Sequence, residues 1–134
     1  MSSLRYDIVT PASRLCSGEA HFVVVPGAEG EMGFYEDHES LVSCLTDGIV
    51  RIHLEQDGEV VRYVTQGGYV EVTGKKVIIL ADRACPVSDI DQANIAEQLR
   101  ECEAQLSNLS EEEANKTNLA SDIAWFKTQV KATE

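Results

Sequence analysis

The first two thirds of the chain alternate apolar and polar residues with the period of two that half-buried β-strands show. The segment LRYDIVT alternates Leu4, Tyr6 and Ile8 with polar residues, and GIVRIHL alternates in the same way from residue 48. AHFVVV is a short β-branched run that ends at Pro26-Gly27. These patterns predict short strands from the N-terminus to about residue 87.

Turn signals separate these runs at close spacing. Asp57-Gly58 lies between GIVRIHL and EVVRYVT, and this pair predicts a hairpin with a type I′ turn. Thr73-Gly74 lies between GGYVEV and KKVIILAD and predicts a second turn. Many short strands without helical patterns between them indicate an antiparallel sandwich or barrel.

The pattern changes after Pro86, because no Gly or Pro follows and apolar residues recur at helical spacing. Ser88 to Asp91 resembles a capping box that begins a first helix, and Ser110 followed by three glutamates predicts the start of a second. Residues 108–110 separate the two helices. The two apolar stripes are Ile95, Leu99, Cys102 and Leu106, and then Leu119, Ile123, Phe126 and Val130.

The predicted fold class is therefore α+β, an N-terminal antiparallel β-sandwich followed by a C-terminal antiparallel helical hairpin. We assign residues 1–87 to the β-sandwich domain and residues 88–134 to the two-helix domain. A two-helix hairpin has little core of its own, so it must pack against the sandwich or against a partner.

Composition narrows the possible functions. The 134 residues carry a net charge of −12, which argues against nucleic acid because such affinity comes largely from Lys and Arg contacts to phosphates. No apolar run is long enough to insert into a membrane, and the start MSSLRYD lacks the apolar core of a signal peptide. We expect a cytoplasmic protein, in which the four widely spaced cysteines are thiols and are mostly buried.

The glycine-rich stretch GAEGEMGFYEDHESLVSCLTDG begins at residue 27 and is laced with carboxylates. Its spacing differs from that of phosphate-binding loops, and the carboxylates would repel an anion. We interpret its glycines as positions of positive φ or close backbone approach in loops between strands.

Catalytic chemistry has little support in this sequence. His38 and Cys44 could form a nucleophilic pair, but no third residue is in place to orient them, so a surface histidine and a buried cysteine are favoured. The three histidines are too dispersed for a metal site. We predict neither catalytic residues nor a metal.

The order of short motifs resembles that of the epsilon subunit family of bacterial F-type ATP synthases along nearly the whole chain. The segments that carry this resemblance are EGEMGFYEDHESLVSCLTDGIVRI, GGYVEV at 67–72 and VIILADRA at 77–84. DIVTPASRLCSGEA at 7–20 is similar to the family's opening strand and the Ser-Gly turn after it.

The resemblance implies a central-stalk rotor subunit without catalytic activity, which couples ion-driven rotation of the c-ring to ATP synthesis. Its implied partners are the gamma subunit, the c-ring and the alpha/beta catalytic head. It would lie peripherally at the cytoplasmic face of the cell membrane. Glu31, Met32 and His38 are the implied partner contacts, where the carboxylate of Glu31 could meet basic loops of the ring.

Two departures from the family pattern concern the helices. Ile90 and Asp91 match the nucleotide-binding motif of ATP-sensing members, but Asn94 and Ile95 replace its Arg and Ala. Without the arginine, the site has no fixed cation to bind a triphosphate. No cofactor is therefore expected, and ATP binding is not predicted. The family's helices can also restrain ATP hydrolysis through basic residues, whereas residues 88–134 hold ten acids and only Arg100, Lys116, Lys127 and Lys131.

Two other interpretations remain open at this level. The first is a free-standing nucleotide sensor in which the helical hairpin opens on binding. The second is a small hydrolase built around Cys44 and His38. The position and regulatory effect of the helices, and the coupling ion, are not determined by the sequence.

Overall fold

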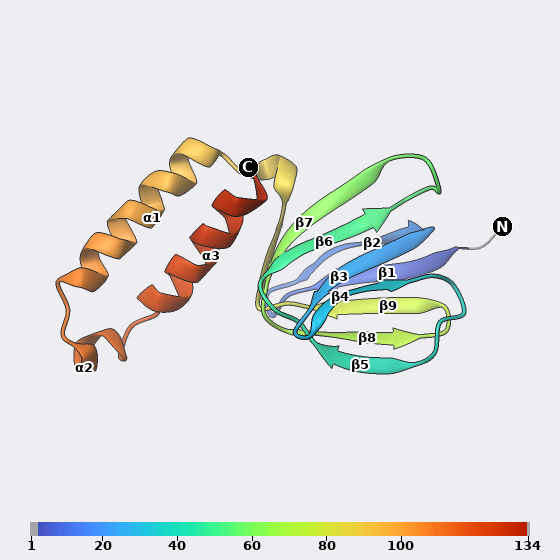
Figure 1. The fold of residues 1–134 in the computed structure, drawn as a ribbon, viewed down its shortest axis with the longest axis horizontal. Coiled ribbons are helices and arrows are strands. Elements are labelled where there is room, and N and C mark those ends of the chain that lie inside the picture. The colour runs from blue at the N-terminus through green and yellow to red at the C-terminus, as the bar shows by residue number, and fades with distance from the viewer. Residues whose placement is uncertain (1–2, 134) are drawn as a thin grey trace. The chain divides into compact units, whose positions relative to one another are not determined.

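The structure, a computed structural model, describes residues 3–133. Its contacts divide the chain into two compact units, Met1–Ser88 and Asp89–Glu134. We call the first the β unit and the second the helical unit (Figure 1). No helix in residues 3–133 combines the length and apolar character needed to cross a membrane.

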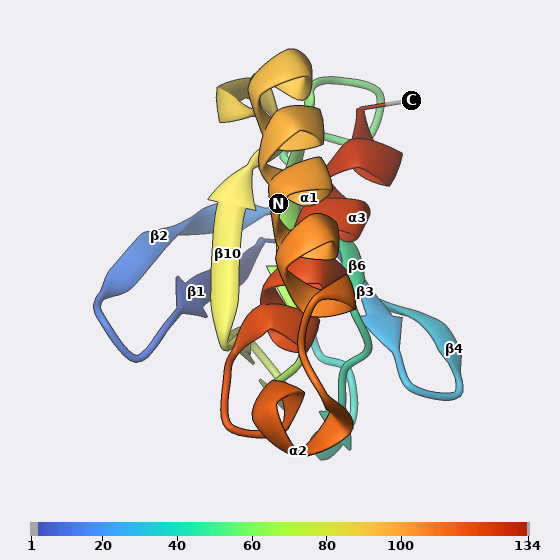
Figure 2. The same cartoon turned by 90° about the vertical axis from the view of Figure 1, so that its left-hand side faces the viewer.

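Ten strands of the described chain form two five-stranded sheets in the β unit. Sheet A has the order β2-β1-β9-β8-β5, and sheet B has the order β10-β7-β6-β3-β4 (Figures 1 and 2). The strands are β1 (Leu4–Val9), β2 (Arg14–Ala20), β3 (Phe22–Gly27), β4 (Gly30–Phe34), β5 (Leu41–Cys44), β6 (Gly48–His53), β7 (Val60–Gln66), β8 (Tyr69–Thr73), β9 (Lys76–Leu80) and β10 (Arg83–Pro86).

The core lies between the inner faces of the two sheets. Every second residue of each strand faces inward, and these side chains are mostly β-branched, which suits a pleated surface. The largest fully buried side chains are Phe34, Leu4, Ile8, Ile52, Ile79, Val23, Val25, Val50, Val64, Val70, Val72 and Val77. The predicted sandwich is confirmed, with one difference: β1 and β9 pair in parallel, so sheet A is mixed.

Two turn predictions were wrong. Ser17-Gly18 lies inside β2, where Gly18 faces the ring of Tyr6, and so it does not form a turn. The β6–β7 hairpin exists, but residues 54–59 connect it, with Leu54 N donating to the Glu59 carbonyl at 3.1 Å. Gly58 is absent from the described glycines of positive φ, so the connection is not a two-residue type I′ turn.

The first helix begins later than the capping prediction required. A short 3₁₀ turn, η1 (Val87–Asp89), precedes α1 (Gln92–Ser107), and the N-cap of α1 is Asp91 rather than Ser88. Asp91 has extended backbone angles, and its side chain accepts a hydrogen bond from the amide of Asn94. A carboxylate is a good N-cap because it satisfies a free amide at the positive end of the helix dipole.

The second predicted helix divides into two. Ser110 and Glu113 form the predicted capping box, but α2 (Glu111–Ala114) is a single turn, and α3 (Leu119–Ala132) follows after residues 115–118. The two hydrogen bonds with Ser110 lower the pKa of the Glu113 carboxyl below its ordinary value of 4.5. The capping box therefore stabilises the turn above that pH and is lost as the pH falls through the lowered value.

The helices α1 and α3 pack against one another as an antiparallel pair (Figure 1). The predicted stripes face inward: Ile123 is 8% exposed, and the other stripe residues are half-buried. No disulfide links the four cysteines, but the prediction that they are mostly buried was wrong. Cys44 is exposed, and the other three are only partly covered.

Candidate functional site

The glycine-rich segment forms a β-hairpin rather than an irregular loop. Strands β3 and β4 pair from Val23↔Phe34 to Gly27↔Gly30, and the connecting residues are Ala28 and Glu29. Gly30 has a φ of +129°, the conformation expected of a glycine at this turn. Gly33 leaves room for the ring of Phe22, which comes within 2.3 Å of where a Cβ would be. The expected positive φ is therefore present at Gly30, whereas Gly33 lies inside a strand and accommodates a side chain instead of the close backbone approach expected in a loop.

Glu31 lies on the outer face of sheet B, with 59% of its side chain exposed. Arg51 on β6 reaches across β3, and its Nη2 donates to Glu31 Oε1 at 3.2 Å. Arg51 is itself 36% exposed, so solvent screens the pair and it stabilises the fold by no more than about 0.5 kcal/mol. Such a weak pair orients the carboxylate and can exchange at little cost for a base on a partner.

Met32 follows Glu31 and points to the opposite face of the strand. It pairs with Val25, packs against the hydrophobic core, and its Cε lies 2.8 Å from where a Cβ on Gly27 would be. Met32 is half-buried.

His38 lies in the loop after β4. Asp37 has a φ of +66°, and its amide donates to the carbonyl of Gly74 in the β8–β9 turn. The His38 ring packs edge-on against Phe34, with ring centroids 4.9 Å apart, and its Nδ1 lies 2.8 Å from the Glu39 carbonyl. Glu31 lies near the start of β4 and His38 lies beyond its end, so the structure does not bring the three predicted contact residues into one cluster.

A group of rings on the outer face of sheet B was not predicted. Phe22 stacks on Tyr35 with centroids 4.2 Å apart, and His53 lies 5.4 Å from Phe22. His21 meets the edge of the Tyr35 ring at 5.6 Å. The β3–β6 register places Phe22 opposite His53, and the register is set by long-range pairing that the sequence pattern does not reveal.

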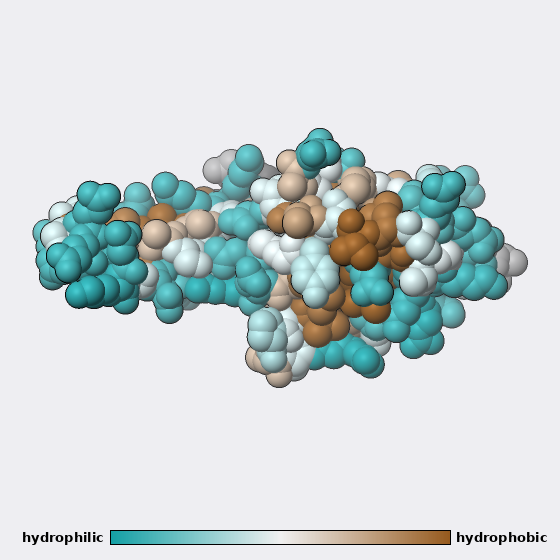
Figure 3. All heavy atoms as spheres, turned by 90° about the horizontal axis from the view of Figure 1, so that it is seen from below, coloured by the Kyte–Doolittle hydropathy of each residue, from teal (hydrophilic) through white to brown (hydrophobic). Residues whose placement is uncertain are grey.

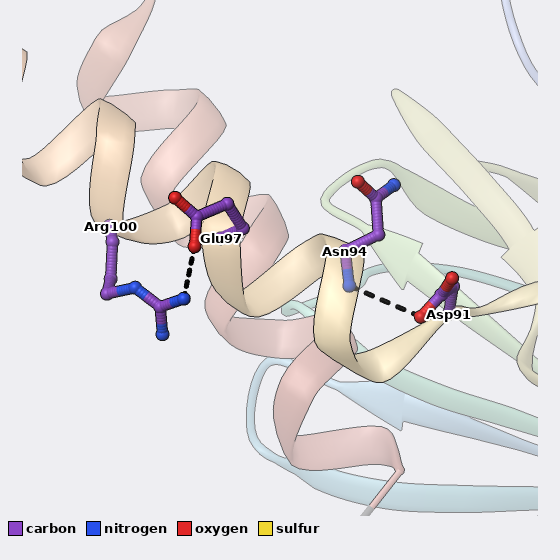
Figure 4. Close-up of polar contacts among 4 residues, drawn as sticks. All are labelled: Asp91, Asn94, Glu97 and Arg100. Carbon is purple, nitrogen blue, oxygen red and sulfur yellow. Dashed lines mark hydrogen bonds and ion pairs between the residues drawn. The ribbon is translucent and has the colours of Figure 1, made fainter.

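The candidate nucleotide-binding residues start the helical unit, where their groups already have local partners (Figure 4). Asp91 Oδ1 accepts the Asn94 amide at 3.2 Å, and Ile90 is half-buried. One turn further along α1, the guanidinium of Arg100 pairs with the carboxylate of Glu97 (Figure 4). The start of α1 thus presents a capping carboxylate and a neutral amide, and the first base along this helix is paired to an acid.

The hydrolase interpretation finds no supporting geometry. Cys44 is the last residue of β5 and pairs with Tyr69, whereas His38 precedes the first residue of that strand. A four-residue strand spans about 10 Å, which keeps the two side chains apart. Cys44 is exposed, so the expectation of a buried cysteine there was wrong.

The comparisons with known proteins cover the whole chain. Residues 3–87 match the family described as "ATP synthase, Delta/Epsilon chain, beta-sandwich domain". The chain is 39% identical over 134 residues to an ATP synthase epsilon chain 2 from Ralstonia nicotianae, covering 100% of this chain and 95% of that one. It is 36% identical over 132 residues to an ATP synthase epsilon chain from Neisseria meningitidis, covering 96% and 94%.

Solved structures show the same fold. A chain in the Euglena gracilis mitochondrial ATP synthase, in an assembly of OSCP, F1 and c-ring, superposes with a TM-score of 0.77 at 24% identity and covers 100% of this chain and 83% of that one. A chain in the Tetrahymena thermophila central stalk and c-ring gives 0.58 at 12% identity, covering 95% and 96%. On the family match and the full-length identity to epsilon chains, the chain belongs to the ATP synthase delta/epsilon chain family.

Proposed function

We propose that this chain is the epsilon subunit of a bacterial F-type ATP synthase and turns with the central stalk. In this role it joins the gamma subunit to the c-ring, so that ion-driven rotation of the ring reaches the alpha/beta catalytic head. The subunit itself takes no part in the chemistry of ATP synthesis. It lies at the cytoplasmic face of the cell membrane, held there through the ring.

The observation that carries this proposal is the full-length identity to epsilon chains, because it includes the helical unit as well as the β-sandwich. The site agrees with a mechanical role. Its exposed groups are a weakly paired carboxylate and a set of stacked rings, which are suited to contact with a protein surface. Within residues 3–133, no three metal-binding side chains gather at one place.

The test is a tagged pull-down from detergent-solubilised membranes of the native organism, with mass spectrometry of the recovered proteins. We expect gamma, alpha, beta and the c-subunit to be recovered together. A tagged gamma subunit serves as the matched control. If gamma brings down the complex while this chain comes down alone, the rotor assignment is wrong and the free-standing sensor becomes the better hypothesis.

We propose that Glu31 contacts a basic loop of the ring, because its carboxylate is exposed and is held by a single solvent-screened arginine. His38 lies at the far end of β4 and serves a different contact, on the side where the β8–β9 turn approaches. Met32 supports the β3–β4 hairpin from its core-facing side, through its contact with Gly27.

We also propose that the helical unit does not bind ATP at cellular concentrations. The Asp91 side chain caps the helix, and Asn94 supplies no positive charge where the motif has a guanidinium. Isothermal titration of the full chain with ATP at about 1 mM, which is on the order of the Kd of a weak site, should give no binding heat. Asn94→Arg restores the missing guanidinium and is the matched variant. Saturable binding by the unmodified chain would contradict this assignment.

Removal of residues 89–134 should change the ATP hydrolysis rate of the reconstituted complex by less than about twofold, because an arm with ten acids and four bases lacks the excess of basic residues through which the family's helices restrain hydrolysis. The rate is measured with an ATP-regenerating assay at low salt. The double substitution Glu101→Lys and Glu103→Lys is the matched variant, and it should slow hydrolysis if charge decides the restraint. A large acceleration on deletion would show that the arm restrains hydrolysis by packing instead.

A further inference from the structure

Part of strand β7 has a free edge in sheet B. The pairing of β10 with β7 runs from Arg83↔Gln66 to Pro86↔Tyr63, and after Pro86 the chain turns into η1. Residues 60–62 therefore pair with β6 on one side, while on the other side they extend beyond the end of β10. A groove of about 310 Å³ opens there, lined by Glu59, Val60, Val61, Arg62, Val87 and Ser88.

The backbone groups of the even-numbered residues of β7 point to the β10 side. Successive residues of an antiparallel strand direct their N–H and C=O groups to alternate neighbours. The Glu59 carbonyl accepts an amide from the β6 side of the hairpin, whereas the Gln66 carbonyl accepts the Asp82 amide at 2.9 Å on the β10 side. By this alternation Val60 and Arg62 direct two N–H donors and two C=O acceptors toward the groove.

This stretch of β7 has few of the features that protect free strand edges. Such edges commonly carry a proline, a bulge or several charges, which prevent pairing with another chain. Val60 and Val61 are β-branched, apolar and half-buried, and the β6–β7 register is continuous along all of β7. The free edge is therefore a straight template on which a further strand can form.

Charge gives the groove a direction. Arg62 is exposed and lies directly opposite Arg51 of β6, and like charges at directly paired positions repel one another. Glu31 neutralises only Arg51, by its 3.2 Å contact with Nη2. Glu59 lies at the other end of the groove lining, three residues before Arg62. An incoming strand thus meets a base at one end of the groove and an acid at the other.

We propose that the β7 edge, by which we mean residues 59–62 with Val87 and Ser88, binds an extended segment of another protein by β-strand addition. The added strand runs antiparallel to β7, in line with β10. It carries an acidic residue opposite Arg62, a β-branched residue opposite Val61 and, three positions after the acid, a basic residue opposite Glu59. This partner is separate from the rotor proteins named above, and the inference does not rest on the proposed function.

The β7 edge differs from the other surfaces that could hold an apolar segment. The view from below shows a broad hydrophobic area on the side of the β unit where β5, β8 and β9 lie (Figure 3), and Val42 of β5 is 68% exposed. Binding there would depend on apolar area, whereas strand addition depends on backbone hydrogen bonds and on the sign of the charge at Arg62. A second copy of the chain is disfavoured, because each copy carries a net charge of −12.

Hydrogen exchange of the full chain, followed by NMR, tests whether the edge is open. The amides of Val61 and Tyr63 are directed to β6 and should be protected. The amides of Val60 and Arg62 should exchange at least about tenfold faster. Equal protection of all four amides in the free chain would show that the chain itself covers this edge, and it would overturn the proposal.

The binding probe is a short capped peptide of threonine and valine that contains Glu-Val-Thr-Lys. Arg62→Glu should weaken its binding to the full chain by at least about tenfold, because the two acids then face each other. N-methylation of the glutamate and threonine amides of this motif should weaken binding at least as much, because it removes the donors that face β7. The double variant Glu59→Lys/Arg62→Glu should instead prefer the peptide with Lys-Val-Thr-Glu.

Arg14→Glu is the matched control, because it makes the same change of charge at an exposed arginine of β2, in the other sheet. Val42→Glu tests the hydrophobic area. Both variants should bind the peptide as the unmodified chain does, and thermal unfolding shows whether every variant is folded. Arg62→Lys keeps the charge and should retain most of the binding.

Three results of the peptide experiment would overturn the proposal. Binding that survives N-methylation, or that Arg14→Glu weakens as much as Arg62→Glu, would show general charge attraction rather than strand addition. Loss of binding in Val42→Glu alone would transfer the contact to the hydrophobic area. No saturable binding at peptide concentrations up to about 1 mM would also exclude a specific site. Each of these results leaves the rotor assignment standing, because the pull-down tests that assignment separately.

Discussion

We expect the substitution Gly68→Ala to lower the free energy of unfolding by more than about 4 kcal/mol. Gly68 has a φ of +89°, and an added Cβ would be 1.7 Å from the Leu80 carbonyl oxygen and 2.8 Å from the Ala81 Cα. Both obstacles are backbone atoms of the strand end beside it, so no side chain can rotate away. The Gly68 carbonyl also accepts the Leu45 amide at 2.9 Å, which ties the displaced residue to a second loop.

Gly30→Ala separates backbone strain from the steric clash. Gly30 also has positive φ, but an added Cβ would meet nothing within 4 Å, so we expect a loss of only about 1–2 kcal/mol. The measurement is urea unfolding followed by circular dichroism on both variants. Equal losses would show that conformational strain alone sets the effect and that Leu80 can withdraw.

Much of the fold follows from local patterns in the sequence. Alternation predicts β1 and β6 because their inward residues form the core, and stripe spacing predicts the face of α1 that meets α3. The capping box at Ser110 and Glu113 depends on residues three apart, which is why the sequence suffices to predict it. These features need no knowledge of which segments meet in space.

The features that sequence reasoning missed depend on distant contacts. Gly18 lies in a strand because it pairs with Tyr6 of β1, whose ring occupies the space that a side chain at position 18 would fill. The β4 segment likewise accepts its glycines because Phe22 packs over Gly33. In the helical unit, residues 115–118 separate the capping box at Ser110 from the apolar stripe of α3. The sequence pattern predicts one continuous helix across both.

The candidate site shows the same division. Glu31 could be predicted as an exposed carboxylate, but its partner Arg51 lies two strands away in sheet B. His38 was assigned to the same contact zone, whereas the length of β4 separates it from Glu31. In sheet A, Val9 pairs with Leu80, Leu80 with Tyr69 and Tyr69 with Cys44. The sequence gives no signal of this row, because each residue comes from a different strand and only the register aligns them.

We expect Phe34→Ala to destabilise the chain by about 3–5 kcal/mol, because it removes the largest fully buried side chain and leaves a cavity between the two sheets. Phe34 is 1% exposed and pairs with Val23 at the end of the β3–β4 hairpin. Its ring also supports His38, whose imidazole meets it edge-on at 4.9 Å. The variant should therefore loosen the loop after β4 as well as the core, which the imidazole proton signals of His38 would report.

Phe34→Leu is the matched control, because leucine refills most of the volume and lacks a ring face. It should cost roughly 1 kcal/mol in the free energy of unfolding, yet it should disturb the His38 signals as Phe34→Ala does. Such a result would separate the packing role of Phe34 from its contact with the imidazole. If the His38 signals remain unchanged in both variants, the hydrogen bond from Asp37 to Gly74 orders the loop without help from the ring.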